Sequence, residues 1–210
     1  MRFDHYFWDY DGTLFDSYPR IIRGFARGAG ALGIALKAEA LLPLAKVSVR
    51  HMIRVTAERF GIPPEALQRE YHRYAEADNY EAARPYEGAV SLLEAVVRHG
   101  GRNYLYTHSG ASTIRSLEYY GIKEYFADYI TAEDSFPSKP APDALLYMIR
   151  KHRLDTARCV MLGDRDIDVQ AGLNAGMAGA LFDPDGFYGD MPIEYRFKTM
   201  REMERTLVGE

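Results

Sequence analysis

The chain has 210 residues, with 26 Lys and Arg against 30 Asp and Glu and a formal net charge of −4. This length suits one α/β domain with a small insertion, and the charge balance, without a basic run, argues against a nucleic-acid partner. A single cysteine excludes a disulfide framework, so we expect a cytoplasmic protein. We find neither a membrane-spanning apolar stretch nor the apolar segment of a signal peptide, and we expect no membrane partner.

The hydrophobic pattern predicts elements that alternate between strand and helix from residue 86 onwards. A strand at 5–10 comes first, and a helix-rich stretch at 18–80 follows it. Then come helix 87–99, strand 102–107, helix 111–120, strand 127–132, helix 141–152, strand 158–162, helix 165–175 and strand 178–182. Such alternation predicts an α/β fold with a Rossmann-like, mostly parallel sheet flanked by helices.

The first strand delivers two carboxylates into a turn. Asp9 and Asp11 follow the apolar run at 6–8, and Gly12 marks the turn. Residues two apart on a strand point to the same side, and two neighbouring acids repel each other unless a cation or a shared proton lies between them. The pair therefore predicts a metal site, acid–base chemistry, or both, although the same string also occurs in ordinary turns.

Three further polar islands follow apolar runs. They are Thr-His-Ser-Gly at 107–110, a lysine between prolines at 137–140, and Gly-Asp-Arg-Asp-Ile-Asp at 163–168. Ligands bind at the carboxyl ends of the strands in open α/β sheets, so we expect these islands and the first acidic pair to share one edge of the sheet.

The four islands, in this order, closely resemble the four sequence motifs of the haloacid dehalogenase superfamily of phosphohydrolases, near its phosphoglycolate phosphatase group. The resemblance covers nearly the whole chain outside 17–85. It implies a Rossmann-like catalytic core at 1–16 and 86–210. The helix-rich interval 17–85, where Ile21, Ile22 and Phe25 keep helical spacing, is similar to the α-helical cap of this superfamily.

The resemblance assigns a role to each acid of the first motif. Asp9 would be the nucleophile that forms an aspartyl-phosphate, and Asp11 the general acid and then the general base. Asp9, the backbone carbonyl of Asp11, and Asp164 would hold Mg²⁺. The implied activity is Mg²⁺-dependent hydrolysis of a small phosphorylated metabolite, by a monomer or a homodimer.

The remaining motif residues would bind the phosphate group. Thr107 would donate a hydrogen bond to a phosphate oxygen, His108 would line the same loop, and Lys139 would neutralise phosphate and nucleophile together. Asp168 would orient Lys139 or support the metal ligands.

The cap would close over the site and read the leaving group. Lys46 and Arg50 lie near a predicted break between cap helices and are candidate substrate contacts, although a solvated helix face is an equal alternative for each.

A dehalogenase has no acid at the second position, so Asp11 argues against that function. Three other functions stay open. A sugar phosphomutase uses a cap histidine early in the cap, and 17–50 contains none. A phosphonatase uses a cap lysine, for which Lys37 and Lys46 are available. A phospho-accepting signalling domain is the alternative outside the enzymes.

Overall fold

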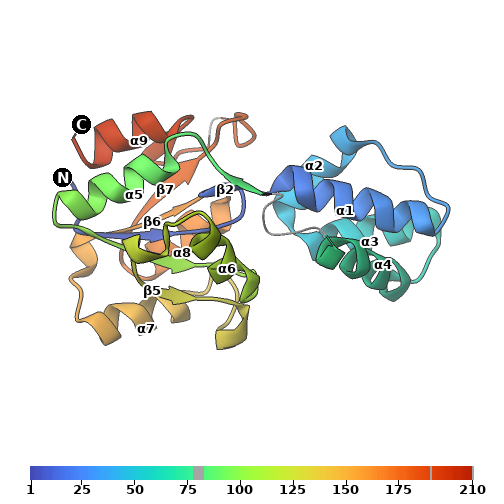
Figure 1. Cartoon of the computed structure of the whole chain (residues 1–210), viewed down its shortest axis with the longest axis horizontal. Coiled ribbons are helices and arrows are strands. Elements are labelled where there is room, and N and C mark those ends of the chain that lie inside the picture. Colours follow the sequence, from blue (N-terminus) through green and yellow to red (C-terminus); the bar gives the residue numbers. More distant parts are fainter. Residues whose placement is uncertain (78–82, 190, 210) are drawn as a thin grey trace. The chain divides into compact units, whose positions relative to one another are not determined.

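The structure is a computed structural model that describes residues 1–77, 83–189 and 191–209. The chain forms two compact units (Figure 1). The larger unit comprises Met1–Phe15 and Pro85–Glu210, and the smaller unit comprises Asp16–Arg84. Strands β2 (Phe15–Asp16) and β3 (Arg84–Pro85) pair in a two-stranded sheet at the point where the chain passes between the units.

The larger unit is built on one six-stranded sheet with the order β5-β4-β1-β6-β7-β8, in which every neighbouring pair is parallel. Its strands are β1 (His5–Trp8), β4 (Arg102–Tyr106), β5 (Phe126–Ile130), β6 (Cys159–Gly163), β7 (Ala178–Phe182) and β8 (Tyr195–Phe197). Strand β6 is buried along its whole length, as expected for a parallel sheet covered on both faces. The predicted Rossmann-like α/β fold is confirmed.

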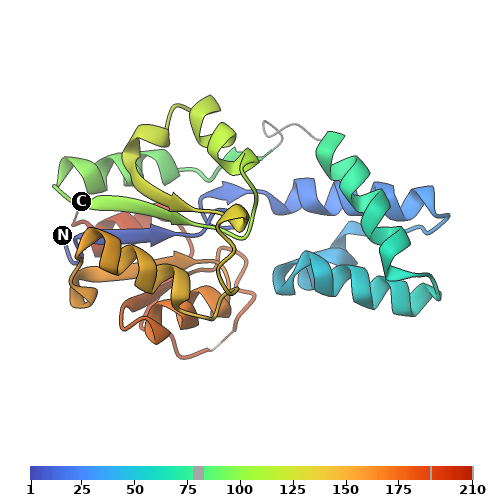
Figure 2. The same ribbon diagram turned by 90° about the horizontal axis from the view of Figure 1, so that it is seen from below.

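Helices cover both faces of this sheet (Figure 2). They are α5 (Ala89–Arg98), α6 (Ser112–Tyr119), α7 (Asp143–His152), α8 (Asp166–Asn174) and α9 (Met200–Leu207), with short 3₁₀ turns at Lys123–Tyr125, Ala132–Asp134 and Thr156–Arg158. The alternation of strand β1 distributes its aromatic side chains between the faces. Phe7 packs in the cluster formed with α7 and α8, whereas the hydroxyl of Tyr6 donates to the carbonyl of Leu207 at the end of α9.

The described part of the smaller unit consists of α1 (Tyr18–Ala31), α2 (Ala38–Val47), α3 (Val49–Phe60) and α4 (Pro64–Ala77). Its core includes Ile21, Ile22 and Phe25, which the helical spacing predicts as one face of α1. Helices α1 and α4 meet closely at Gly28, where a Cβ would lie 2.9 Å from the backbone nitrogen of Tyr71.

Several elements differ from the sequence prediction. Strand β1 ends at Trp8, so Asp9 follows the strand and does not lie on it, and Asp11 forms an isolated bridge with Phe15. Strand β8 and helix α9 were not predicted. The predicted helical stretch 18–80 divides into four helices, and its last residues lie outside the described part of the chain. No helix within the described ranges is long and apolar enough to cross a membrane.

Candidate active site

The sequence islands meet at one edge of the sheet because they follow parallel strands. Asp9 comes directly after β1, Thr107 after β4 and Asp164 after β6. The backbone N–H of Asp9 donates to the carbonyl of Leu162 at 2.9 Å, and that of Thr107 donates to the carbonyl of Ile130 at 3.0 Å. These two bonds extend the hydrogen-bond ladder of the sheet to Asp9 and Thr107 and so fix the backbone from which both side chains project.

Lys139 lies at the centre of the site. Its Nζ is 2.7 Å from Oδ1 of Asp9 and 2.8 Å from Oδ1 of Asp168, and it donates to the carbonyl of Tyr106 at 2.9 Å. The side chain of Lys139 is fully buried, as is that of Asp168. A buried ammonium group is costly unless it is paired, and here three oxygens surround it.

Burial and charge shift the titration of this cluster. Burial raises the pKa of the Asp9 carboxyl to about 7, although Lys139 acts in the opposite direction. Burial also opposes the charge on Lys139, but Asp168 and Asp9 outweigh it and raise the pKa of that amine. Lys139 therefore carries a positive charge at neutral pH, and a cation bound to Asp9 would favour its ionised form.

The carboxylates can accommodate a metal ion. Oxygen atoms of Asp9, Asp164 and Asp168 lie within 4.8 Å of one another. Asp168 is already engaged, since Oδ1 contacts Lys139 and Oδ2 accepts the backbone N–H of Arg165 at 3.1 Å. Oδ2 of Asp9 and Oδ1 of Asp11 are buried and find no hydrogen-bond partner among the described residues. An all-oxygen set with such unsatisfied acceptors fits a hard divalent cation such as Mg²⁺.

Asp11 is oriented by a residue that the sequence reasoning missed. The hydroxyl of Ser109 donates to Oδ2 of Asp11, and the backbone N–H of Ser109 donates to Oγ1 of Thr107 at 3.0 Å. Thr107 is buried, whereas Asp11 is half-buried. Ser109 belongs to the Thr-His-Ser-Gly island, and its place in that motif is the sequence feature that could have indicated its contact with Asp11.

His108 contacts the backbone at Lys139. Its Nε2 accepts the N–H of Lys139 at 3.1 Å. Loss of hydration, together with the positive charges of Lys139 and Arg165, lowers the pKa of His108 to about 4. The ring is therefore neutral at pH 7, with its proton on Nδ1.

The two candidate residues of the smaller unit differ in exposure. Lys46, in the last turn of α2, is buried with Nζ 5.2 Å from the ring centroid of Tyr18. Arg50, in the first turn of α3, is exposed.

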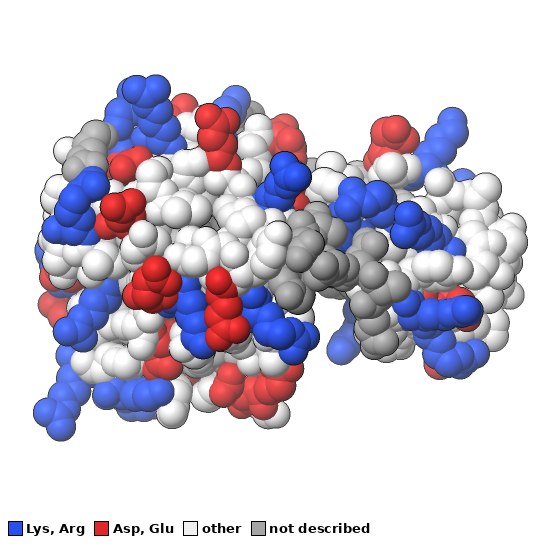
Figure 3. Space-filling model, viewed as in Figure 1, with Lys and Arg blue, Asp and Glu red and all other residues white. Residues whose placement is uncertain are grey.

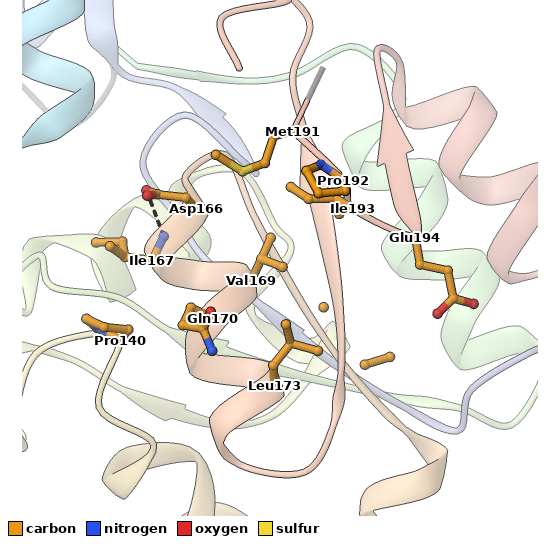
Figure 4. Close-up of a pocket in the computed structure, with 12 residues that line it drawn as sticks. Pro140, Asp166, Ile167, Val169, Gln170, Leu173, Met191, Pro192, Ile193 and Glu194 are labelled. Carbon is orange, nitrogen blue, oxygen red and sulfur yellow. Dashed lines mark hydrogen bonds between the residues drawn. The ribbon is translucent and has the colours of Figure 1, made fainter. Parts of the chain in front are cut away.

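A separate hollow of about 580 Å³ lies beside α8 (Figure 4). Its lining is mostly apolar and includes Ile167, Val169, Leu173 and Met191. None of the carboxylates that contact Lys139 lines it, so it is distinct from the cluster described above.

Comparison with known proteins identifies the family of the chain. Residues 6–182 match the family model described as haloacid dehalogenase-like hydrolase. A phosphoglycolate phosphatase of Agrobacterium fabrum is 30% identical over 88% of this chain and 82% of that protein. The fructose-1-phosphate phosphatase YqaB of Escherichia coli is 24% identical over 84% of this chain and 94% of that protein.

Solved structures show the same fold. A hydrolase from Streptococcus pneumoniae is 30% identical, with a TM-score of 0.67 over 87% of this chain and 94% of that one. A family hydrolase from Deinococcus radiodurans, described with bound phosphate and sodium, is 19% identical with a TM-score of 0.79 over 98% and 95%. With most of its length matched by the family model, the chain belongs to the haloacid dehalogenase-like hydrolases.

Proposed function

We propose that this protein is a Mg²⁺-dependent phosphatase that hydrolyses a small phosphomonoester through an aspartyl-phosphate on Asp9. The observation that carries the proposal is the buried contact of Lys139 with Asp9, at 2.7 Å, at the edge of the sheet where Asp164 and Asp168 also lie. A phosphate ester resists attack because its oxygens are negative, and this site supplies a nucleophile beside a fixed positive charge. The phosphatases among the matched relatives support the same chemistry.

The first step would transfer the phosphoryl group to the protein. An oxygen of Asp9 attacks phosphorus, and the bond between phosphorus and the ester oxygen breaks. The leaving oxygen takes a proton from Asp11, which Ser109 holds by its hydroxyl. Lys139 and Thr107 stabilise the negative charge on the phosphate oxygens.

The second step would release inorganic phosphate. Asp11, now ionised, removes a proton from water, whose oxygen attacks phosphorus and displaces the carboxylate of Asp9. Both protonation states of Asp11 are used in turn, so the enzyme returns to its starting form. In this scheme the neutral His108 lines the phosphate loop and carries no proton to the leaving group.

Asp9, Asp164 and the backbone carbonyl of Asp11 would hold Mg²⁺. The cation would neutralise charge on the phosphoryl group and on the carboxylates as the bond to phosphorus changes. Asp168, whose oxygens are occupied by Lys139 and the N–H of Arg165, is better suited to hold the lysine than to bind metal.

The smaller unit would act as a cap that selects the substrate. The stretch 16–84 contains 11 Lys and Arg against 8 Asp and Glu, although the whole chain is net negative. Basic side chains gather on the visible face of this unit (Figure 3). This excess suits an anionic metabolite, and Lys46 and Arg50 are the proposed substrate contacts. We infer that the protein acts in the cytoplasm as a monomer or homodimer.

A panel of phosphorylated metabolites, assayed for phosphate release with Mg²⁺, tests the function. We expect at least one small phosphomonoester to be turned over well above p-nitrophenyl phosphate, and Asp9→Asn to abolish both activities. If Asp9→Asn retained wild-type turnover, the proposed nucleophile would be wrong. If no ester were hydrolysed with Mg²⁺, the phosphatase assignment would be wrong.

A further inference from the structure

We propose that His108 and Asn174 are positioning residues, which hydrogen-bond the Lys139 N–H and the Pro140 carbonyl and so place the Lys139 amine between Asp9 and Asp168. The inference rests on the proposed function, in which Lys139 acts on the phosphoryl group. The two positioning side chains come from different parts of the fold. His108 follows β4, and Asn174 is the last residue of α8.

The first of the two hydrogen bonds is made to the backbone amide of Lys139. The backbone N–H of Lys139 donates to Nε2 of His108 at 3.1 Å. A backbone amide can only donate, so Nε2 must offer a lone pair and the ring proton must lie on Nδ1. The ring also stands edge-on against Tyr106, with centroids 5.8 Å apart and planes at 83°. His108 is thereby fixed as an acceptor and is not free to donate a proton from Nε2.

The second hydrogen bond is made to the backbone carbonyl of Pro140. Nδ2 of Asn174 donates to the carbonyl of Pro140 at 2.9 Å, and Oδ1 of Asn174 accepts from Nε2 of Gln170 at 2.8 Å. A carbonyl can only accept, so the amide nitrogen of Asn174 must face Pro140. Gln170 and Pro140 both lie in the view of Figure 4, and Gln170 is one helical turn before Asn174.

The position of this backbone decides where the amine ends. The lysine side chain is flexible because it has four rotatable bonds. Its Nζ nevertheless lies 2.7 Å from Oδ1 of Asp9 and 2.8 Å from Oδ1 of Asp168. The segment belongs to a connection between β5 and α7 and lies outside any strand of the sheet. In a strand, backbone hydrogen bonds to neighbouring strands would fix the position of these residues. Here the side chains of His108 and Asn174 supply hydrogen bonds to two consecutive residues instead. Misplacement of a catalytic group by about 1 Å can cost up to ~100-fold in rate.

The experiment compares an acceptor with a non-acceptor at the same position. We would measure kcat and KM for p-nitrophenyl phosphate with saturating Mg²⁺ in His108→Leu and His108→Gln. The leucine variant should lose between ~10- and ~100-fold in kcat with little change in KM, the range expected for a misplaced catalytic group. The glutamine variant should recover most of the loss, because its side-chain carbonyl can accept the Lys139 N–H.

Asn174→Asp is the corresponding variant on the other side. The carboxylate cannot donate a hydrogen bond to the Pro140 carbonyl. We therefore expect kcat to fall by ~10- to ~100-fold, as in His108→Leu. His99→Leu is a matched control, since His99 also hydrogen-bonds a backbone atom, the carbonyl of Ala95 at 2.9 Å, but lies at the end of α5. It should leave kcat unchanged.

The same substitution of His108, made in a Lys139→Ala variant, tests whether His108 affects kcat through Lys139. In Lys139→Ala, the further change from His108 to leucine should cost less than about 2-fold, because the group it positions is gone. A full additional loss in that background would overturn the proposal. Equal losses for leucine and glutamine at His108 would also overturn it.

A readout without turnover separates this inference from the proposed function. Backbone amide exchange of Lys139, followed by NMR in the resting enzyme, should be slow in the wild type and His108→Gln and fast in His108→Leu. If this pattern held while no ester was hydrolysed, the phosphatase assignment would fail and the contact of His108 with Lys139 would stand. If Lys139 exchanged equally in all three proteins, the positioning role would be wrong.

Discussion

Asp9 and Asp11 have the same side chain but different surroundings. Asp9 is buried against Lys139, which leaves one carboxylate oxygen without a partner among the described residues. Asp11 is half-buried, and a hydroxyl donates to it. A buried carboxylate beside a lysine suits a nucleophile, and an acid with solvent access suits proton transfer.

Substituting the two acids should therefore produce two different defects. Asp9→Asn removes the nucleophile, so every phosphate ester should be inert. Asp11→Asn keeps the size of the side chain but removes the proton for the leaving oxygen. An alkyl leaving group needs that proton badly and should lose ~10²–10⁴-fold in the first step, whereas an aryl leaving group such as p-nitrophenolate should lose far less.

Rapid-quench kinetics with an alkyl and an aryl ester would measure this difference. The second step should slow for both esters in Asp11→Asn, so the aryl ester should give a burst of phenolate with phosphate held on Asp9. Equal first-step losses for the two esters would contradict the assignment of Asp11 as general acid.

The proposed role of Asp164 as a metal ligand predicts a dependence on cation type. Three oxygen ligands and a phosphate suit a small cation that keeps its waters, so activity should need Mg²⁺ and be inhibited by Ca²⁺. Asp164→Ala should raise the Mg²⁺ concentration needed for half-maximal activity, as a titration in chelator-treated buffer would show. Full wild-type activity in excess chelator would contradict the metal requirement.

His108 predicts a pH dependence of stability. Its pKa falls from 6.5 to about 4 on folding, so below pH 6.5 the unfolded chain binds a proton that the folded chain does not. The stability supplied by the neutral ring is present above pH 6.5 and is lost as the pH falls towards 4. Urea unfolding at pH 7 and pH 5 should show a larger fall in the wild type than in His108→Gln. Equal falls would mean that the pKa of His108 is not lowered on folding.

The helices of the smaller unit predict a contrast between two glycines of α1. At Gly28 an added Cβ would lie 2.9 Å from the backbone nitrogen of Tyr71 in α4, and the backbone cannot yield without separating the helices. Gly28→Ala should therefore destabilise the protein by about 1–3 kcal/mol. Gly30 has no atom within 4 Å of an added Cβ, so Gly30→Ala should be neutral or stabilise by up to ~1 kcal/mol.

Thermal unfolding of both variants would measure the contrast. Equal midpoints for Gly28→Ala and Gly30→Ala would show that α1 and α4 are not packed as closely as Gly28 indicates.

Most elements of the larger unit could be predicted because their apolar runs are long and end in turns. The end of β1 could not, since nothing in the string from Trp8 to Asp11 marks where ladder pairing stops. Helix α9 has a sequence signature, because Thr199 and Glu202 form a capping box at its N-terminus and the buried Met200, Met203 and Leu207 keep helical spacing.

The placement of the candidate residues was predictable where they follow strands and unpredictable where it depends on partners distant in sequence. Asp9, Thr107 and Asp164 each begin a loop at the same edge of the sheet, a consequence of parallel strand order. The bond from Asn174 to Pro140 joins α8 to a loop that precedes α7, and no local pattern indicates it. Such contacts are fixed only when the elements pack.

We assign phosphate binding to the larger unit and substrate selection to the smaller unit. This assignment predicts that a substitution can change one without the other. Lys46→Ala or Arg50→Ala should change kcat/KM for the best metabolite by ~10- to 150-fold, the worth of a charged hydrogen bond, while inhibition by inorganic phosphate stays nearly the same. Arg54→Ala, which removes an exposed pair with Glu58, is the control. An unaltered metabolite profile in both variants would mean that Lys46 and Arg50 do not contact the substrate.

The central place of β1 in the sheet has a consequence for the synthesis of the chain. His5 pairs with Arg102 on one side and with Cys159 on the other, so the first strand to leave the ribosome has no partner until much later. The helices of the smaller unit make local contacts and can form in the meantime, whereas closing the long loops to β4 and β6 is slow. A nascent chain that stops before residue 100 leaves the otherwise buried Tyr6, Phe7 and Trp8 uncovered. The strand that leads into Asp9 therefore stays unpaired until the chain is long enough to supply β4 and β6.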